Sequence, residues 1–119
     1  MHKTILLAED DHAIHEVVTI ILEGEGYRVL HAMTEAEVFT SIKKEVPHLL
    51  LLDIGLGGSD GKNIAQQLKN NAETQSIPIV IVSANAETEA IAKESNADGF
   101  LAKPFELETL IAIAKKFIA

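Results

Sequence analysis

The stretch Leu49-Leu50-Leu51-Leu52-Asp53 places one carboxylate at the end of four consecutive leucines. Two other apolar runs also end in polar side chains: residues 5–8 lead into Glu9-Asp10-Asp11, and residues 79–82 lead into Ser83. Short, continuous apolar runs are typical of strands that are covered on both faces of a parallel sheet. If these runs are neighbouring parallel strands, their polar ends meet at one edge of one sheet.

Segments with helical periodicity separate the apolar runs. Ile14, Val17, Val18, Ile21 and Leu22 recur at i, i+3, i+4, i+7 and i+8, which predicts an amphipathic helix ending near residues 24–26. A second helix is predicted from a capping box formed by Thr34 and Glu37, and it should end before Pro47. The other predicted elements are strands at 27–31 and 99–102, and helices at 61–70, at 86–94 and from 105 onward.

The last two helices differ in their apolar content. The segment 86–94 has few large apolar positions, so we expect a short, weakly anchored helix there. The final helix carries a clear apolar stripe, with Ile113 lying off it. The predicted stripe consists of Leu107, Leu110, Ile111, Ala114, Phe117 and Ile118.

The order of elements is (βα)5. Crossovers between parallel strands are right-handed, so this order predicts an α/β fold with a doubly wound, five-stranded parallel sheet. The chain has 119 residues, no internal repeat and no linker-like tract, and we expect a single domain over residues 1–119.

The composition excludes several classes of function. Eighteen acidic and ten basic residues give a formal charge of −8, so we expect no direct binding to nucleic acid, which requires a basic patch. There is no cysteine, and no apolar stretch approaches the roughly 18 residues of a membrane span. These features, with an N-terminal run too short for a signal sequence, predict a cytoplasmic protein without membrane contact.

Three carboxylates at one sheet edge require a compensating charge. Two carboxylates some 4 Å apart repel by about 4 kcal/mol at an effective dielectric near 20. Glu9, Asp10 and Asp53 offer oxygen ligands only, and such ligands select a hard cation. We therefore expect Mg²⁺ as the cofactor.

The residues predicted to lie near Asp53 suit a carboxylate that acts as a nucleophile toward phosphorus. A carboxylate can attack phosphorus to form an aspartyl phosphate, and a cation and a hydroxyl donor beside it would stabilise the phosphoryl group. Lys103 and Ser83 supply these two groups from the ends of the fifth and fourth predicted strands. Taken alone, a lysine such as Lys103 is more simply explained as a solvated charge, and a serine such as Ser83 as a turn residue.

The order and spacing of these residues resemble the receiver domain of two-component response regulators over essentially the whole chain. The resemblance rests on Glu9-Asp10, Asp53, Ser83-Ala84 and Lys103-Pro104-Phe105. It implies a receiver domain with the flavodoxin-like strand order 2-1-3-4-5, similar to the single-domain chemotaxis-type regulators.

The resemblance also implies roles for single residues. Asp53 would be the phosphoacceptor and would ligate Mg²⁺ together with Asp10 and the backbone carbonyl of Gly55, while Glu9 would act largely through water. Lys103 would hold the phosphoryl group.

Three further assignments follow from the same resemblance. The bond from Lys103 to Pro104 would be cis, and Ser83 with Phe100 would form the switch. From the sequence alone, Phe100 could equally be an ordinary core aromatic. The stretch from Ser83 to Lys103, which contains the fourth helix, is shorter than is usual in the family by roughly half a helical turn.

The implied function is that of a signalling switch. The phosphoryl donor would be a sensor histidine kinase or a phosphotransfer protein. The target would be a downstream effector, a fused output domain or a second copy in a phosphorylation-dependent homodimer. Such a domain catalyses only its own Mg²⁺-dependent phosphorylation and dephosphorylation, so we do not expect an enzyme acting on external substrates.

Two alternatives use the same fold or the same nucleophile. A flavodoxin-like cofactor binder would need a hydroxyl- and glycine-rich loop after the first strand, where this chain has acidic residues. An aspartyl phosphohydrolase would need a second carboxylate soon after Asp53, where Gly55 and Leu56 stand. The five histidines form no convincing set of zinc ligands, since exposed histidines are the simpler explanation. They are His2, His12, His15, His31 and His48.

Overall fold

The computed structural model describes residues 2–58 and 60–118. Ser59 and the two terminal residues of the predicted domain lie outside this range. The strands are β1 (Thr4–Ala8), β2 (Arg28–Ala32), β3 (Leu49–Asp53), β4 (Ile79–Ser83) and β5 (Gly99–Ala102). The helices are α1 (His12–Gly24), α2 (Glu35–Lys44), α3 (Gly61–Lys69), α4 (Thr88–Glu94) and α5 (Leu107–Phe117), with a 3-10 turn at Leu56–Gly58.

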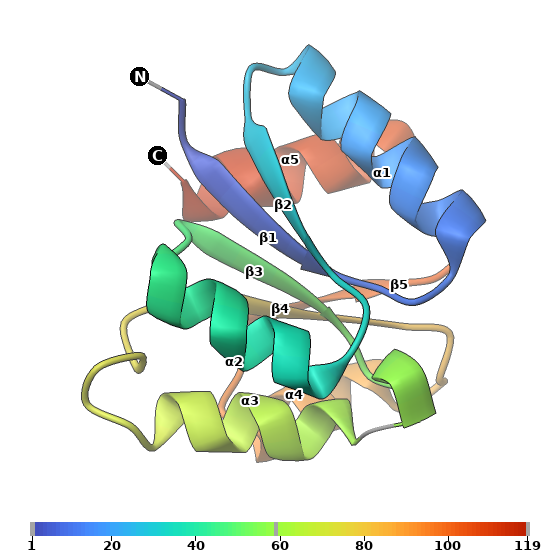
Figure 1. Ribbon diagram of the computed structural model, residues 1–119. Coiled ribbons are helices and arrows are strands. Elements are labelled where there is room, and N and C mark those ends of the chain that lie inside the picture. The colour runs from blue at the N-terminus through green and yellow to red at the C-terminus, as the bar shows by residue number, and fades with distance from the viewer. Residues whose placement is uncertain (1, 59, 119) are drawn as a thin grey trace.

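The strands form one parallel sheet in the order β2-β1-β3-β4-β5, which confirms the predicted fold. Helices α1 and α5 cover one face of the sheet, and α2, α3 and α4 cover the other (Figure 1). No helix within the described residues is both long enough and apolar enough to cross a membrane.

The core consists of two layers, one on each face of the sheet. Alternate residues of β3 point to opposite layers: Leu50 and Leu52 pack with α2 and α3, whereas Leu49 and Leu51 pack with α1 and α5. All four leucines are buried, and each fully buried leucine contributes about 1.5–3 kcal/mol. This double burial is why the strand reads as an unbroken apolar run.

Side-chain caps begin the first two helices, and the cap of the second was predicted. Asp11 accepts hydrogen bonds from the N–H groups of Ala13 and Ile14. Thr34 Oγ1 accepts from the N–H of Glu37 at 3.2 Å. The Glu37 carboxylate accepts from Met33 N–H at 2.8 Å, one residue earlier than the ideal capping box requires. These caps fix the loops that follow β1 and β2.

The predicted apolar stripes need two corrections. Val17 is 55% exposed, because α1 contacts the sheet along the narrower line of His15, Val18 and Leu22. On α5 the buried residues are Leu110 and Ala114, and Leu107 is exposed in the first turn.

Ile113 was predicted to lie off the α5 stripe. It is half-buried, packs against the core layer and faces α4 across a groove. The flank of α5 beside the short α4 is therefore part of the packing.

Helix α4 is short, as expected. It has only seven residues and no side-chain hydrogen bond at its N-cap, and it buries only Thr88 and Ala92. An exposed ion pair between Lys62 and Glu94 joins it to α3.

Candidate functional site at the carboxyl edge of the sheet

The sheet brings the three predicted carboxylates together. Ala8 of β1 pairs with Leu52 of β3, so Glu9 and Asp53 leave adjacent strands at the same level. One carboxylate oxygen from each of Glu9, Asp10 and Asp53 lies within 4.8 Å of the other two. Within residues 2–58 and 60–118, no other group of three or more possible metal ligands comes together. The site lies where the strand order reverses between β1 and β3, as in other doubly wound sheets.

Glu9 is only 2% exposed and forms an ion pair with Lys103. The Lys103 Nζ atom lies 2.7 Å from Glu9 Oε1, and Glu9 Oε2 accepts a hydrogen bond from Asp11 N–H at 3.1 Å. Burial would lower the pKa of Lys103, but the hydrogen bond that Lys103 donates to Glu9, together with the negative charges of Asp53 and Glu9, outweighs it and raises that pKa. Lys103 is therefore held as a cation at the site.

Asp53 lies beside this ion pair. Its Oδ1 atom is 3.6 Å from Lys103 Nζ, and it accepts a long hydrogen bond of 3.5 Å from Gly55 N–H. Burial, and then the negative charge of Glu9, raise the pKa of Asp53 above its ordinary value, although Lys103 and the Gly55 N–H oppose this shift. In the metal-free protein, the nearby positive charge is therefore too small to offset burial and the repulsion from Glu9, and the ionised form of Asp53 is disfavoured.

The raised pKa of Asp53 predicts that the free energy of unfolding of the metal-free protein depends on pH. A raised folded-state pKa means that the folded chain binds a proton more readily than the unfolded chain. The metal-free protein therefore loses stability as the pH rises from 3.8 through the raised value. At neutral pH we therefore expect Asp53→Asn to increase the free energy of unfolding of the metal-free protein.

Denaturant titrations at several pH values, in the presence of a chelator, check this expectation. The advantage of the variant should disappear as the pH falls toward 3.8. An advantage that stays constant with pH would show that something other than the charge of Asp53 is responsible.

Ser83 is the buried last residue of β4. Its Oγ atom accepts a hydrogen bond from Asn85 N–H at 2.9 Å, and its carbonyl accepts one from Lys103 N–H at 2.8 Å. The peptide bond from Lys103 to Pro104 is cis, the conformation that the resemblance implied. Ser83 and Lys103 thus lie side by side at the ends of β4 and β5.

Phe100 is 41% exposed, so it is not a core aromatic. It borders a groove of about 300 Å³ between α4 and α5, together with Ile113 and Phe117. It lies on β5 two residues before Ala102, which pairs with Ser83. The structure therefore places Phe100 at a surface groove, connected to Ser83 through the pairing of β4 with β5.

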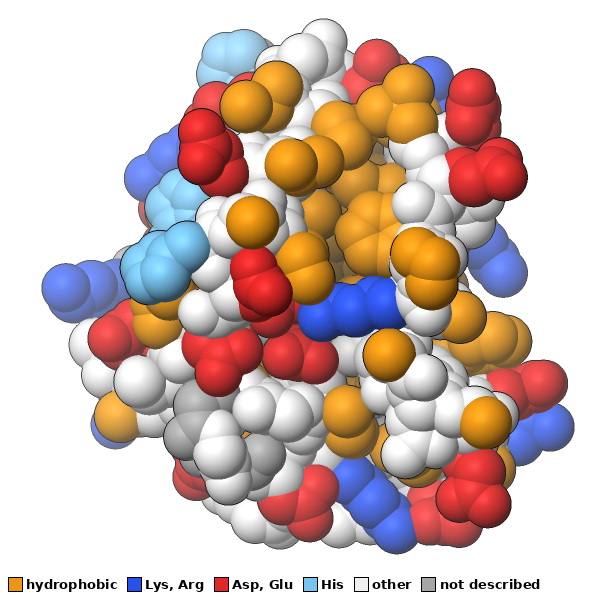
Figure 2. Space-filling model, turned by 90° about the vertical axis from the view of Figure 1, so that its right-hand side faces the viewer, with side chains coloured by type: hydrophobic (Ala, Val, Ile, Leu, Met, Phe, Trp, Pro, Cys, Tyr) orange, Lys and Arg blue, Asp and Glu red, His pale blue; other side chains and the backbone are white. Residues whose placement is uncertain are grey.

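An apolar groove beside Lys103 was not predicted. It has a volume of about 460 Å³, and Figure 2 shows this face with a hollow of hydrophobic side chains next to basic and acidic ones. Its lining residues are Ala13, Ile14, Val17, Val18, Ala84, Lys103, Pro104 and Phe105. The helical periodicity placed Val17 on the apolar stripe of α1, so nothing in the sequence indicated that this side chain lines a surface groove.

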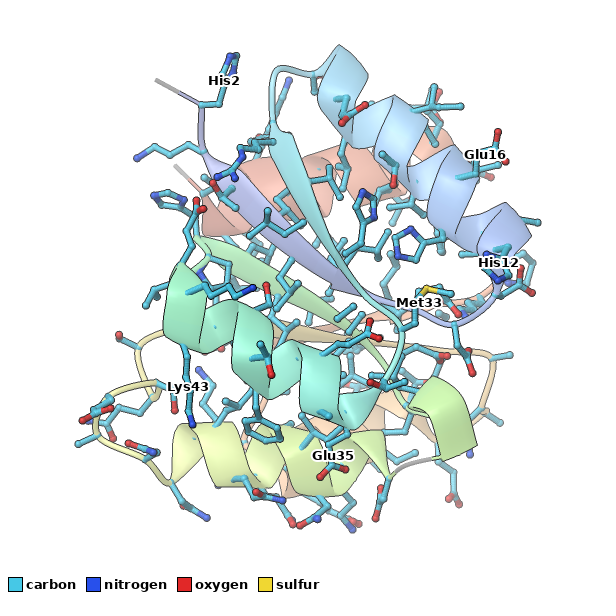
Figure 3. The ribbon with its side chains drawn as sticks, viewed as in Figure 1. His2, His12, Glu16, Met33, Glu35 and Lys43 are labelled. Atoms are coloured by element: carbon cyan, nitrogen blue, oxygen red, sulfur yellow. The ribbon has the colours of Figure 1, made fainter. Side chains whose placement is uncertain are left out.

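One histidine is buried, contrary to the expectation of exposure. His15 packs against His31, with 4.5 Å between ring centroids, and burial and the nearby His31 lower its pKa. The spacing to Val18 and Leu22 at i+3 and i+7 could have indicated this. His12 lies near the start of α1 and Met33 beyond β2, at the same end of the molecule (Figure 3).

Comparison with known proteins agrees with this geometry. A family model described as the response regulator receiver domain matches residues 5–115. The chain belongs to this family. The membership confirms the resemblance seen in the sequence; receiver domains are signalling domains, and Mg²⁺ binding and aspartate phosphorylation are general features of the family.

Similar receiver domains occur in longer regulators. The phosphate regulon transcriptional regulatory protein PhoB of Pseudomonas aeruginosa is 35% identical over 115 residues, which are 95% of this chain and 50% of PhoB. The DNA-binding response regulator MtrA of Mycobacterium tuberculosis is 32% identical over 94% of this chain and 49% of its own. The chain thus spans about half the length of these relatives.

Solved structures match the whole receiver domain. A putative response regulator from Chloroflexus aurantiacus aligns with a TM-score of 0.93 and 28% identity, covering 99% of this chain and 98% of its own. The receiver domain of NtrX from Brucella abortus aligns with a TM-score of 0.87 and 28% identity, covering 96% of this chain and 97% of its own.

Proposed function

We propose that this chain is a phosphoacceptor switch in which Asp53 takes a phosphoryl group from a sensor histidine kinase or a phosphotransfer protein. One observation carries the proposal. The oxygens of Glu9, Asp10 and Asp53 converge at one sheet edge, with the Lys103 ammonium 3.6 Å from Asp53. A nucleophile, a cation and a set of hard metal ligands are thereby combined in one place.

The donor set fits Mg²⁺. One carboxylate oxygen from each of Glu9, Asp10 and Asp53 lies within 4.8 Å of the other two, and oxygen-only ligands of this kind suit a hard cation. Asp10, Asp53 and the Gly55 carbonyl would hold the ion directly, and Glu9 would act through water because both its oxygens already have partners. When bound, the ion would offset the negative charge of the carboxylates and the phosphoryl oxygens.

Asp53 would act as the nucleophile. A carboxylate oxygen forms a bond to phosphorus while the bond between phosphorus and the donor's imidazole nitrogen breaks. The nitrogen keeps the electron pair and takes up a proton from solvent. Lys103, already held as a cation by Glu9, would pair with a phosphoryl oxygen.

The output would be a conformational change rather than a released product. Ser83 would turn its hydroxyl toward the phosphoryl group, and Phe100 at the groove between α4 and α5 would respond. The target would be a downstream effector, a fused output domain or a second copy in a phosphorylation-dependent homodimer. With a charge of −8, we assign no direct nucleic-acid contact to this chain.

Labelling with a small acyl phosphate tests the proposed function. Intact-protein mass spectrometry should show the addition of a single phosphoryl group in the presence of Mg²⁺ and none with excess chelator. Generic phosphate esters should not be hydrolysed. Equal labelling with and without metal would refute the metal-dependent mechanism.

Substitution of Asp10 should weaken Mg²⁺ binding and phosphorylation of Asp53 together. Asp10→Asn removes one negative ligand but leaves the acceptor in place, so we expect the Mg²⁺ dissociation constant to rise roughly tenfold or more. Labelling of Asp53 should fall in parallel and recover at high Mg²⁺. Calorimetric titration and labelling across a Mg²⁺ series check this; labelling that stays low at saturating metal would assign Asp10 another role.

Substitution of Ser83 should leave phosphorylation of Asp53 intact but weaken the conformational change at Phe100. Ser83→Ala retains Asp53 and Lys103, so we expect it to be phosphorylated to the same stoichiometry. Without the hydroxyl, phosphorylation should change the NMR shifts of Phe100 and its β5 neighbours less than in the wild type. A full response at β5 in Ser83→Ala would contradict the proposed coupling.

A further inference from the structure

Gly61 lies in unusually close contact with the backbone of the candidate phosphoacceptor. It is the buried first residue of α3. A Cβ atom at this position would lie 2.7 Å from Ile54 Cα, 2.8 Å from the Asp53 carbonyl oxygen and 2.9 Å from the Ile54 carbonyl oxygen. All three are backbone atoms, which cannot turn aside as a flexible side chain can.

Two hydrogen bonds hold the contacting backbone in place. Gly61 N–H donates to the Ile54 carbonyl at 2.8 Å, which draws the start of α3 onto the end of β3. Ile54 N–H donates to the Val82 carbonyl at 3.1 Å, which ties the same residue to β4. The backbone between Asp53 and Ile54 is therefore fixed between the sheet and the helix.

Steric demand, rather than backbone conformation, explains the glycine. The structure gives a positive φ for Gly26 and Gly58 but not for Gly61. An alanine at position 61 would thus suit the local backbone angles and fail only through its contacts. Those contacts involve Asp53 and the residue that follows it.

We propose that Gly61 is a positioning residue that sets the place of the Asp53 carboxylate and the Gly55 carbonyl by allowing α3 to rest directly on the end of β3. The inference rests on the proposed function. Moving Asp53 and Ile54 by the several tenths of an ångström that a Cβ requires would displace the nucleophile and one metal ligand together. A 1 Å misplacement at a reacting centre can cost about a hundredfold in rate.

Gly61→Ala tests this role, with two controls. Gly24→Ala makes the same change at the end of α1, where a Cβ would meet nothing within 4 Å. Ile64→Val weakens the packing of α3 in the core without placing an atom against Asp53. For each variant the Mg²⁺ dissociation constant, the labelling rate at saturating Mg²⁺ and the thermal unfolding of the metal-free protein are measured.

We expect Gly61→Ala to fold, to bind Mg²⁺ about tenfold more weakly and to be labelled about tenfold more slowly even at saturating metal. Gly24→Ala should match the wild type, and Ile64→Val should unfold at a lower temperature with unchanged Mg²⁺ affinity. Wild-type binding and labelling in Gly61→Ala would overturn the inference. So would failure of that variant to fold, or an equal loss of affinity in Ile64→Val, because Gly61 would then serve the fold alone.

The wild type separates this inference from the proposed function. If the wild type neither binds Mg²⁺ nor becomes labelled, the proposed function itself fails. If the wild type does both and Gly61→Ala does so equally well, only the positioning role fails.

Discussion

Asp53→Asn should abolish phosphoryl transfer to this domain. An amide oxygen is a far weaker nucleophile than a carboxylate oxygen, and the amide leaves the metal ligands with one less charge. We expect incorporation from a small acyl phosphate to fall from one phosphoryl group per chain to none detectable by intact-protein mass spectrometry. Because removal of the raised-pKa carboxylate should stabilise the metal-free fold, unfolding cannot explain the loss.

Asp60→Asn is a matched control for this result. Asp60 follows on the same loop, and its side chain caps α3 by accepting a hydrogen bond from Lys62 N–H. Asparagine caps a helix as well as aspartate does, so this variant should be labelled like the wild type. Full labelling of Asp53→Asn would refute the assignment of the acceptor, and peptide mapping would then identify the residue that carries the phosphoryl group.

Lys103→Met should both destabilise the domain and slow phosphorylation. Glu9 is almost fully buried, and Lys103 is its ion-pair partner at 2.7 Å. Removing one member of a buried pair leaves an uncompensated charge and costs about 3–5 kcal/mol. Lys103 is less buried than Glu9, so we expect a loss near the lower limit, about 3 kcal/mol, in denaturant unfolding at neutral pH without metal.

The double variant Glu9→Gln/Lys103→Met distinguishes pairing from packing. If the buried charge causes the loss, neutralising Glu9 in the Lys103→Met background should restore most of the stability, and the two substitutions should be strongly non-additive. Labelling should stay slow in the double variant, because the cation beside the phosphoryl group is still missing. Additive losses of stability would show that Lys103 acts through packing and not through Glu9.

Much of the fold could be predicted because its signals are local. The four leucines before Asp53 are buried on both faces of the sheet, and this produces the unbroken apolar run. Asp11 and Thr34 cap helices through hydrogen bonds to residues two or three positions away. The composition and few apolar positions of the fourth helix also matched its short, loosely packed form.

The stripes of α1 and α5 show where local signals fail. Periodicity identifies the side of a helix that is apolar, but the width of the buried strip depends on how the helix crosses the sheet. Val17 is therefore exposed while His15 is buried, and Ile113 packs against the core while Leu107 does not.

The (βα)5 order and the residues that follow each strand could be predicted, because strand period, helix period and turn chemistry act over a few residues. Which of these residues meet depends on the three-dimensional packing of the elements. The pairing of Lys103 with Glu9 spans 94 positions, and the approach of Gly61 to the backbone of Asp53 depends on how α3 docks on β3. Such contacts follow from the packing of whole elements against one another, and no local pattern of residues encodes that packing.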